Sequence, residues 1–268
     1  MAVPSSGELS LLKIRRELGG NYNSSTSHSD VSLKECSDGT VATINTQNAS
    51  ADRPDGSAPH AITEFYAYDH SLSGLETITN KFSFSLDGID EYLDLGEEYH
   101  QIGSGNCTIM AWINTSSVAS GNVDIFSIGA NGGSRFRMQR RGNKVGAYIE
   151  SDSHSGGAAL TGSTTIAANT WYHVALVKSS TTFTIYLNGS SDGSITQSGT
   201  FNSQEGIIGA YFGGGSNFFG GKIDEAALFN SALSSNVISS INNATGSLVT
   251  ADLESLSTAP LAWYRMGD

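Results

Sequence analysis

The sequence predicts an all-β protein, an antiparallel β-sandwich with a largely extended N-terminal arm and one or two short helices. Of its 268 residues only 15% are charged and 31 are glycine. A chain rich in glycine, serine and threonine suits short strands joined by tight turns better than a helical bundle. After residue 81, short strand-like runs alternate with turn residues. Residues 21–60 are poor in apolar side chains and have little core of their own.

Residues 1–75 are the predicted N-terminal anchoring arm. A short helix is expected within residues 1–20, because Leu9 and Leu12 fall on one side of it and a Gly-Gly pair follows. An arm with so few apolar residues gains order most readily by packing against other subunits. The predicted subunit contacts in the arm are Leu9, Leu12, Ile14, Arg15, Arg16, Phe65, Tyr66 and Tyr68.

Residues 76–268 are the predicted sandwich domain. Residues 107–113 are apolar on both faces, which predicts a central strand covered on both sides. A short amphipathic helix is expected where Leu233, Val237 and Ile241 recur at intervals of four. The remaining predicted strands are 81–87, 91–95, 123–129, 135–141, 143–150, 171–178, 183–189, 206–215, 220–230 and 261–267.

Five runs in this domain carry a family resemblance. They read FSLDGIDEYLDL, CTIMAWI, WYHVALVK, TIYLNG and GKIDEAALFNSALS, in that order. Together they resemble the laminin-G/pentraxin-type, concanavalin A-like jelly roll across residues 81–242. The resemblance implies a jelly-roll sandwich. It leaves function open, because this fold hosts lectins, adhesion modules, hydrolase domains and structural spacers.

Three positions within these runs have a local interpretation. Trp171 opens a strand and is expected to fill the sandwich core. Leu187-Asn188-Gly189 predicts a tight turn, because asparagine and glycine tolerate positive φ. Asp224 lies in an otherwise apolar strand, where a hydrogen-bonded structural acceptor is favoured over a ligand contact or a catalyst.

The N-terminal residues resemble a different group of proteins. The runs MAVPSSGELSLLKIRREL, VSLKECSDGTVATIN and AITEFYAYDH look like the N-terminal segments of tailed-bacteriophage virion proteins of the fibre, tail or decoration type. The resemblance implies a virion protein assembled in the host cytoplasm, with other virion proteins as partners. By analogy with phage appendages it also suggests a homo-oligomer, for which a trimer is the working guess.

Charge and hydropathy exclude other partners. The net charge of −12 argues against sequence-independent nucleic-acid binding, which needs clustered positive charge. No apolar run approaches the ~20 residues that span a bilayer. The N-terminus also lacks the basic-then-apolar order of a secretory signal.

The Gly-rich stretch from residue 211 to residue 221 is the predicted ligand site. Its aromatic rings could stack on sugar rings while an amide gives direction. The alternative is that the rings fill the core at a turn between two strands. The predicted ligand contacts are Tyr211, Phe212, Asn217, Phe218 and Phe219.

A basic strand offers a second surface. On residues 135–141, one face carries Phe136 and Met138, and the other carries Arg135, Arg137, Gln139 and Arg141. One interpretation is a solvated outer face that protects a sheet edge. The other is an anion or subunit-contact patch, because an acidic neighbouring chain would be attracted to it. Arg135 and Arg137 are therefore included among the predicted subunit contacts.

No pattern predicts catalysis. The chain has no Glu-x-Asp-x-Glu strand of the kind that glycosidases on this sandwich use, and its Gly-x-Ser-x-Gly match at residues 189–193 lies in a polar turn. Two cysteines and scattered histidines form no metal pattern. No cofactor is predicted. Calcium stays an open alternative at carboxylates that lack an Asp-x-Asp-x-Asp loop, namely Asp87, Asp90, Asp94, Asp152 and Asp192.

These observations favour a non-enzymatic structural or adhesion protein of a tailed-phage virion. The arm would attach it to the particle, and the exposed jelly roll could bind a host-surface glycan. Repetition on a particle would turn weak contacts into avidity. The first alternative is a free carbohydrate-binding, lectin-like module. The second, less favoured, is an enzyme that acts on polysaccharide.

Overall fold

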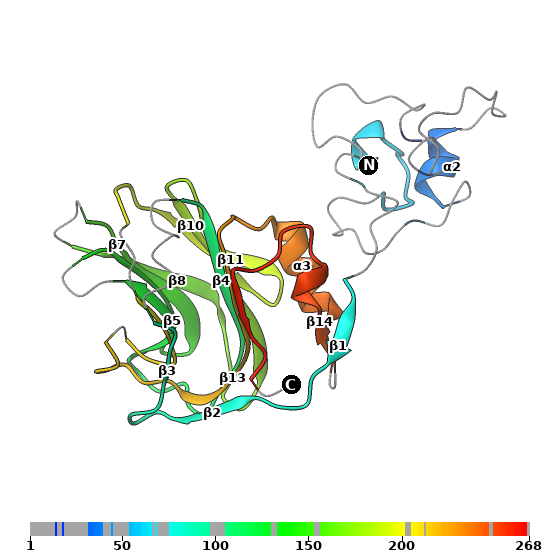
Figure 1. Ribbon diagram of the computed structural model, residues 1–268. Coiled ribbons are helices and arrows are strands. Elements are labelled where there is room, and N and C mark those ends of the chain that lie inside the picture. Colours follow the sequence, from blue (N-terminus) through cyan, green and yellow to red (C-terminus); the bar gives the residue numbers. More distant parts are fainter. Residues whose placement is uncertain are drawn as a thin grey trace. The chain divides into compact units, whose positions relative to one another are not determined.

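The computed structural model describes two compact units, Met1–Gly74 and Leu75–Asp268 (Figure 1). The use of the first unit as an anchoring arm stays a prediction. The described residues are 14, 18, 32–39, 44, 54–65, 68, 75–96, 105–129, 133–152, 156–201, 205–211, 213–246 and 249–266.

The first unit has a small core of its own. Helix α2 (Leu33–Ser37) begins at Ser32, whose side chain accepts from the Glu35 amide in a capping box. A 3₁₀ turn, η2 (Ile62–Phe65), follows. The buried side chains of the cluster are Ile14, Leu18, Cys36, Phe65 and Tyr68.

This cluster corrects part of the predicted subunit contact. Ile14, Phe65 and Tyr68 have no exposed surface. The Phe65 and Tyr68 rings meet edge to face, with centroids 6.0 Å apart. These three side chains are therefore buried inside the unit and are not presented to another subunit. The other predicted arm contacts, Leu9, Leu12, Arg15, Arg16 and Tyr66, lie outside the described residues.

The second unit is an antiparallel jelly-roll sandwich, as predicted (Figure 1). One layer is a seven-stranded sheet in which β13 also pairs with β2. Its strands, in order, are β11 (Ser190–Thr196), β10 (Thr182–Leu187), β9 (Trp171–Ser179), β4 (Cys107–Thr115), β13 (Gly220–Phe229) and β15 (Ala262–Tyr264), with β2 spanning Phe84–Asp87. The other layer is six-stranded, with β3 (Leu93–Asp94), β12 (Glu205–Ile208), β5 (Asn122–Gly129), β6 (Arg135–Arg141), β7 (Lys144–Glu150) and β8 (Ala158–Thr165).

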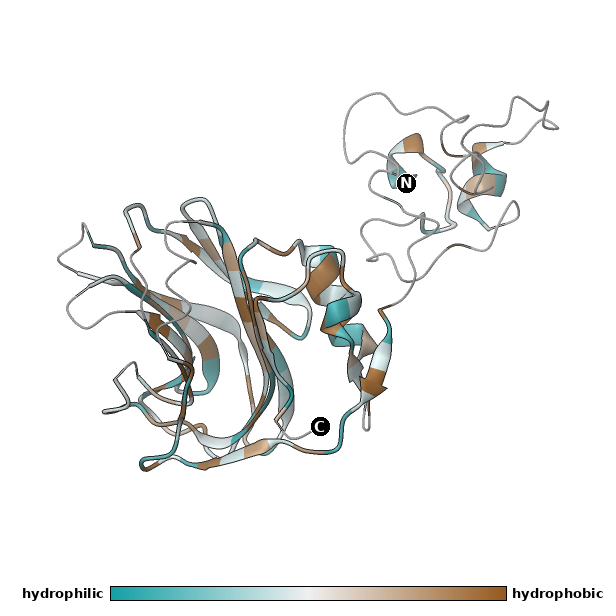
Figure 2. Cartoon of the chain, in the orientation of Figure 1, coloured by the Kyte–Doolittle hydropathy of each residue, from teal (hydrophilic) through white to brown (hydrophobic). Residues whose placement is uncertain are grey.

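The core lies between the two sheets because alternate residues of each strand point inward. On β6, Phe136 and Met138 are buried there. The Phe136 ring lies near those of Phe183 and Phe201, with centroids 6.2 and 6.3 Å away. Figure 2 shows apolar residues recurring along the strands of both layers. This pattern is the physical basis for the sandwich.

Strand β4 is covered on both faces, which confirms the prediction for residues 107–113. Ile109 and Ile113 belong to the core between the sheets. Met110 belongs to a second cluster, together with Ile238 and Ile241 of helix α3 (Ser235–Ala244). The Ser234 side chain caps α3 by accepting from the Val237 amide. The helix therefore covers the outer side of the seven-stranded sheet (Figure 1).

Beside α3 lies a separate two-stranded sheet, β1 (Thr77–Thr79) with β14 (Val249–Ala251), followed by the 3₁₀ turn η4 (Leu253–Ser255). Sequence reasoning assigned none of these three elements. It also missed β8 and took part of β11 for a polar turn. Both β8 and β11 are edge strands rich in serine, threonine and glycine, so their apolar signal is weak.

The predicted turn at Asn188-Gly189 is confirmed. Asn188 has φ 48° and Gly189 has φ 79°, the left-handed conformations of a tight hairpin, and the turn joins β10 to β11. The predicted core role of Trp171 is wrong, because 39% of this residue is exposed. Among the described helices, none has the length and apolarity needed to cross a membrane.

Candidate functional site

The outer face of the six-stranded sheet is polar around β6. Phe136 and Met138 point into the core, so Arg135, Arg137 and Gln139 lie on the opposite face, as the alternation predicted. The strand itself lies between β5 and β7. The interpretation of this face as edge protection is therefore wrong, since β6 has a hydrogen-bonded neighbour on each side.

The β6–β7 hairpin sets the first contact of the site. Its register places Arg137 directly opposite Tyr148 and Arg135 opposite Glu150. The guanidinium carbon of Arg137 lies over the Tyr148 ring, 4.8 Å from its centroid. A guanidinium at this distance is attracted to the negative face of an aromatic ring.

Tyr211 supplies a second ring from a loop after β12. The Arg137 guanidinium carbon lies 4.8 Å from the centroid of this ring as well. Arg135 donates from Nη1 to the Tyr211 hydroxyl at 2.8 Å. The loop is closed by two backbone bonds, from the Tyr211 amide to the Ser216 carbonyl and from the Gly214 amide to the Tyr211 carbonyl, each 2.9 Å. Tyr211 is therefore fixed relative to both arginines.

Asp124 anchors the arginine from beneath. Its carboxylate is fully buried and accepts from Arg137 Nη1 at 3.0 Å, from Gln139 Nε2 at 2.7 Å and from Asn217 Nδ2 at 3.2 Å. Burial raises the pKa of Asp124, while Arg137 and the two amides act in the opposite direction. A buried carboxylate with three donors holds the guanidinium in one orientation.

Glu150 holds the neighbouring arginine. Arg135 donates from Nε to a Glu150 carboxylate oxygen at 2.6 Å and also forms an ion pair with it through Nη2. The Tyr148 hydroxyl is 3.4 Å from the same oxygen. Both members of the pair keep part of their surface exposed. This end of the site therefore offers donors and acceptors that solvent can reach.

Gly157 makes room for the Tyr148 ring. A Cβ atom added at Gly157 would lie 2.2 Å from Cζ of Tyr148 and 2.3 Å from its hydroxyl. Non-bonded contacts this short do not occur at real Cβ atoms, so a side chain here would displace the ring. The glycine is thus part of the site although it bears no functional group.

The other four predicted ligand residues have four different outcomes. Asn217 faces the site through Asp124. Phe218 is half-buried beside Tyr92, with ring centroids 6.4 Å apart. Phe219 is fully buried in the sandwich core, which corrects its assignment as a ligand contact. Phe212 lies outside the described residues.

The carboxylates considered for calcium have local partners. Asp87 accepts from the Ile89 amide, Asp94 from the Gly96 amide and Asp152 from the Ser134 amide. Asp192 accepts from the Ser163 and Thr164 hydroxyls. Within the part of the chain that the structure describes, no group of three or more His, Cys, Asp or Glu could hold a metal ion. Both cysteines, Cys36 and Cys107, are buried.

Sequence reasoning found Arg135, Arg137, Tyr211 and Asn217 but did not connect them. It missed Asp124, Tyr148, Glu150 and Gly157. A hairpin about Gly142-Asn143 would have paired Arg137 with Tyr148 and Arg135 with Glu150, so part of the signal lay in the sequence. The approach of Tyr211 depends on a loop conformation that no periodicity encodes.

The arrangement suits recognition of a polar ring. Tyr148 and Tyr211 each keep part of their surface exposed, beside two arginines held by carboxylates. Aromatic faces stack on apolar faces of ligands, and charged groups form the stronger hydrogen bonds. Because the side chains are already fixed, little conformational entropy is lost when a ligand binds.

Residues 87–239 match the family model described as the concanavalin A-like lectin/glucanases superfamily. No curated protein has a sequence that matches this chain. Several solved structures share the fold at low sequence identity. One is the CBM40 domain of the Ruminococcus gnavus IT-sialidase bound to α2,3-sialyllactose, with 15% identity, a TM-score of 0.52, and coverage of 63% of this chain and 100% of that one.

A Bacteroides ovatus protein described as carbohydrate-binding is 18% identical, with a TM-score of 0.52 over 71% of this chain and 53% of that one. The binding domain of botulinum neurotoxin serotype G is 16% identical, with a TM-score of 0.50 over 64% of this chain and 45% of that one. At these identities the likeness shows the fold.

Proposed function

Because this chain belongs to the concanavalin A-like lectin/glucanase superfamily, we propose that it is a non-enzymatic, lectin-like module that binds carbohydrate on the outer face of its six-stranded sheet. The observation that carries the proposal is the placement of the Arg137 guanidinium over two partly exposed tyrosine rings, Tyr148 and Tyr211. The ligand is a glycan whose ring stacks on a tyrosine and whose hydroxyl or acidic oxygens accept from the arginines.

Two features support this proposal. Arg137 has five N–H donors, and its hydrogen bond to Asp124 uses one of them. Its Nε atom is buried with no hydrogen-bond partner among the described residues. The fold neighbours include a domain bound to sialyllactose and a protein described as carbohydrate-binding. The family name covers lectins as well as glucanases, so the choice of lectin rests on the site.

The test is a glycan panel probed with the full chain and two variants. The panel contains neutral, sialylated, uronate-bearing and sulfated glycans. We expect Tyr148→Ala and Tyr211→Ala each to weaken binding by about tenfold, the value of one aromatic stacking contact. The matched control is Lys144→Gln, which removes a cation from the far end of β7 and should leave the affinity unchanged.

Two results would overturn the proposal. One is that the full chain binds no glycan of the panel. The other is retention that neither tyrosine variant changes while both variants keep the wild-type melting temperature. Mass spectrometry of a bound oligosaccharide after incubation detects any cleavage. Cleavage products would contradict the non-enzymatic part of the proposal and support an enzyme that acts on polysaccharide.

The virion role is a finer proposal that rests on the resemblance of the N-terminal residues. In this proposal the first unit attaches the chain to other virion proteins as a homo-oligomer, a trimer, and the jelly roll is exposed to a host-surface polysaccharide. Comparing the full chain with residues 75–268 by light scattering tests the first part. Loss of assembly in the shorter chain supports attachment, and equal monomeric mass in both contradicts it.

A further inference from the structure

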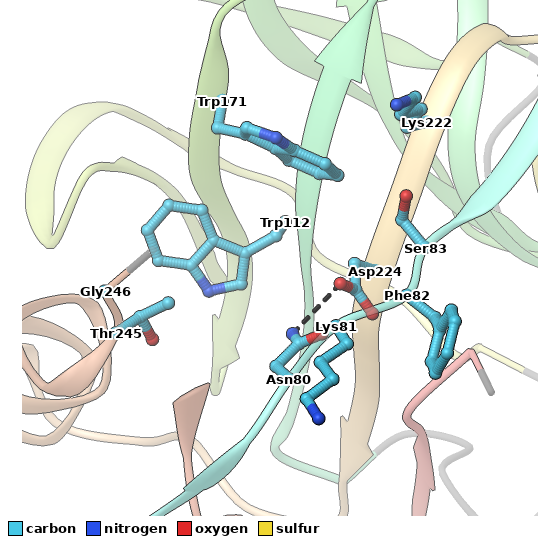
Figure 3. Close-up of a pocket in the computed structure, with 10 residues that line it drawn as sticks. All are labelled: Asn80, Lys81, Phe82, Ser83, Trp112, Trp171, Lys222, Asp224, Thr245 and Gly246. Atoms are coloured by element: carbon cyan, nitrogen blue, oxygen red, sulfur yellow. Dashed lines mark hydrogen bonds between the residues drawn. The ribbon is translucent and has the colours of Figure 1, made fainter. Parts of the chain in front are cut away.

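The seven-stranded sheet has a pocket on its outer side, on the opposite face of the sandwich from the arginine–tyrosine site. Trp112 lies two residues after Met110 on β4, so both side chains are on the outer face of the sheet, where Met110 packs under α3. The pocket has a volume of about 510 Å³ and is lined by residues of β4, β9 and β13, by the segment between β1 and β2, and by Thr245-Gly246 after α3 (Figure 3).

Two of the three tryptophans in the chain line this pocket. Trp171 is 39% exposed at the first position of β9, where burial gives no reason for so large an apolar side chain. The Trp112 Nε1 atom is buried and has no hydrogen-bond partner among the described residues. In Figure 3 this nitrogen lies on the side of the indole toward Asn80. A ligand oxygen in the pocket would supply an acceptor for this donor.

A bulge in β13 supplies the acceptor group of the pocket. The pairing of β13 with β4 shifts between Asp224 and Ala227, and Glu225 has φ 50°. Consecutive strand residues normally point to opposite faces, but here Asn80 Nδ2 donates to both carboxylates, at 3.0 Å to Asp224 and 3.1 Å to Glu225. Bulges commonly re-aim a side chain at a functional site. The bulge therefore fixes the Asp224 carboxylate at the pocket wall (Figure 3).

We propose that this pocket is a second carbohydrate site, which takes a neutral pyranose unit. Its apolar ring face stacks on Trp171, one hydroxyl accepts from Trp112 Nε1, and another donates to Asp224. The Lys222 side chain, which also lines the pocket, provides a further donor. A carboxylate acceptor beside exposed indole is the combination that suits neutral hydroxyl groups. The site stands independently of the proposed function of the other sheet.

The experiment follows the three indole N–H signals of the full chain by nitrogen–proton correlation spectroscopy during titration. The probes are cellotriose, maltotriose and N,N′-diacetylchitobiose. Saturable shifts of the Trp112 and Trp171 signals by at least one probe are expected. The Trp263 signal should not shift, because its Nε1 atom already donates to Glu225 at 2.6 Å.

Variants separate this site from the other. Trp171→Ala and Asp224→Asn should each lower the affinity for the saccharide by about tenfold. Tyr211→Ala, on the opposite sheet, should leave this affinity unchanged. Failure of every probe to move either pocket signal would overturn the second site, as would unchanged affinity in folded Trp171→Ala. If the pocket binds a saccharide but Tyr148→Ala and Tyr211→Ala change the affinity for no glycan, the proposed function of the six-stranded sheet fails and this inference stands.

Discussion

Arg137 and Tyr148 are directly opposite residues of neighbouring strands, and the guanidinium carbon of one lies 4.8 Å from the ring centroid of the other. The register of the β6–β7 hairpin therefore brings the cation and the aromatic ring of the proposed site together. Beneath it, Asp124 is a buried carboxylate whose only ion-pair partner among the described residues is Arg137. The stability of the sheet and the geometry of the site therefore depend on the same contact.

The first prediction concerns that ion pair. Arg137→Gln should lower the free energy of unfolding by about 3 kcal/mol at pH 7, because it leaves the Asp124 charge buried without a cation. The loss should shrink as the pH falls, because burial raises the pKa of Asp124 and a protonated carboxyl no longer needs a cation beside it. Urea unfolding measures both effects. The double variant Asp124→Asn with Arg137→Gln should recover part of the loss, and a purely additive double variant would contradict the pairing.

The second prediction uses two adjacent glycines. Gly157→Ala should displace the Tyr148 ring, because the new Cβ would lie 2.2 Å from it. Glycan binding on this sheet should fall about as far as in Tyr148→Ala, by about tenfold. Gly156→Ala is the matched control, since a Cβ there would meet no atom within 4 Å. Equal affinities in the two variants would show that the position of the Tyr148 ring is not required.

The third prediction concerns His173, which is fully buried beside Trp112 with ring centroids 5.3 Å apart. Burial lowers the pKa of His173 to about 4. The unfolded chain, with an ordinary pKa near 6.5, binds a proton that the folded chain excludes, so stability should fall as the pH drops from about 6.5 to 4, by ~3 kcal/mol in total.

Neither ring nitrogen of His173 has a hydrogen-bond partner among the described residues. His173→Phe should therefore flatten the stability profile across this pH window without a large loss at pH 7. Thermal unfolding of both proteins at pH 7 and pH 4.5 provides the comparison. An unchanged slope in His173→Phe would assign the acid sensitivity to other groups.

The fourth prediction tests the outer cover of β4. Met110 is 1% exposed within the cluster formed under α3. Met110→Ala should destabilise the second unit by about 2–4 kcal/mol through lost burial and the cavity left behind. Ile89→Ala, at a residue that is 71% exposed, is the control and should change stability by less than about 0.5 kcal/mol. A small effect of Met110→Ala would mean that α3 contributes little to the fold.

The sequence by itself determined the sandwich, because period-two alternation and turn residues act locally. It placed Phe136 and Met138 inward and Arg135 and Arg137 outward, and it located the Asn188-Gly189 turn. It could not predict that Trp171 is exposed, since the sequence pattern around the first residue of a strand is the same whether that residue is buried or exposed. It missed the edge strands β8 and β11, whose short polar side chains leave little apolar pattern.

Only the tertiary structure decided which residues meet. Tyr211 is more than seventy residues from Arg135 along the chain, yet its hydroxyl accepts a bond from that arginine at 2.8 Å. Asn80 reaches Asp224 across 144 positions and holds both carboxylates of a bulge. Such contacts depend on loop conformation, strand register and a local shift in pairing. Periodicity carries none of these, because it records which face a residue occupies and not which distant residue shares that face.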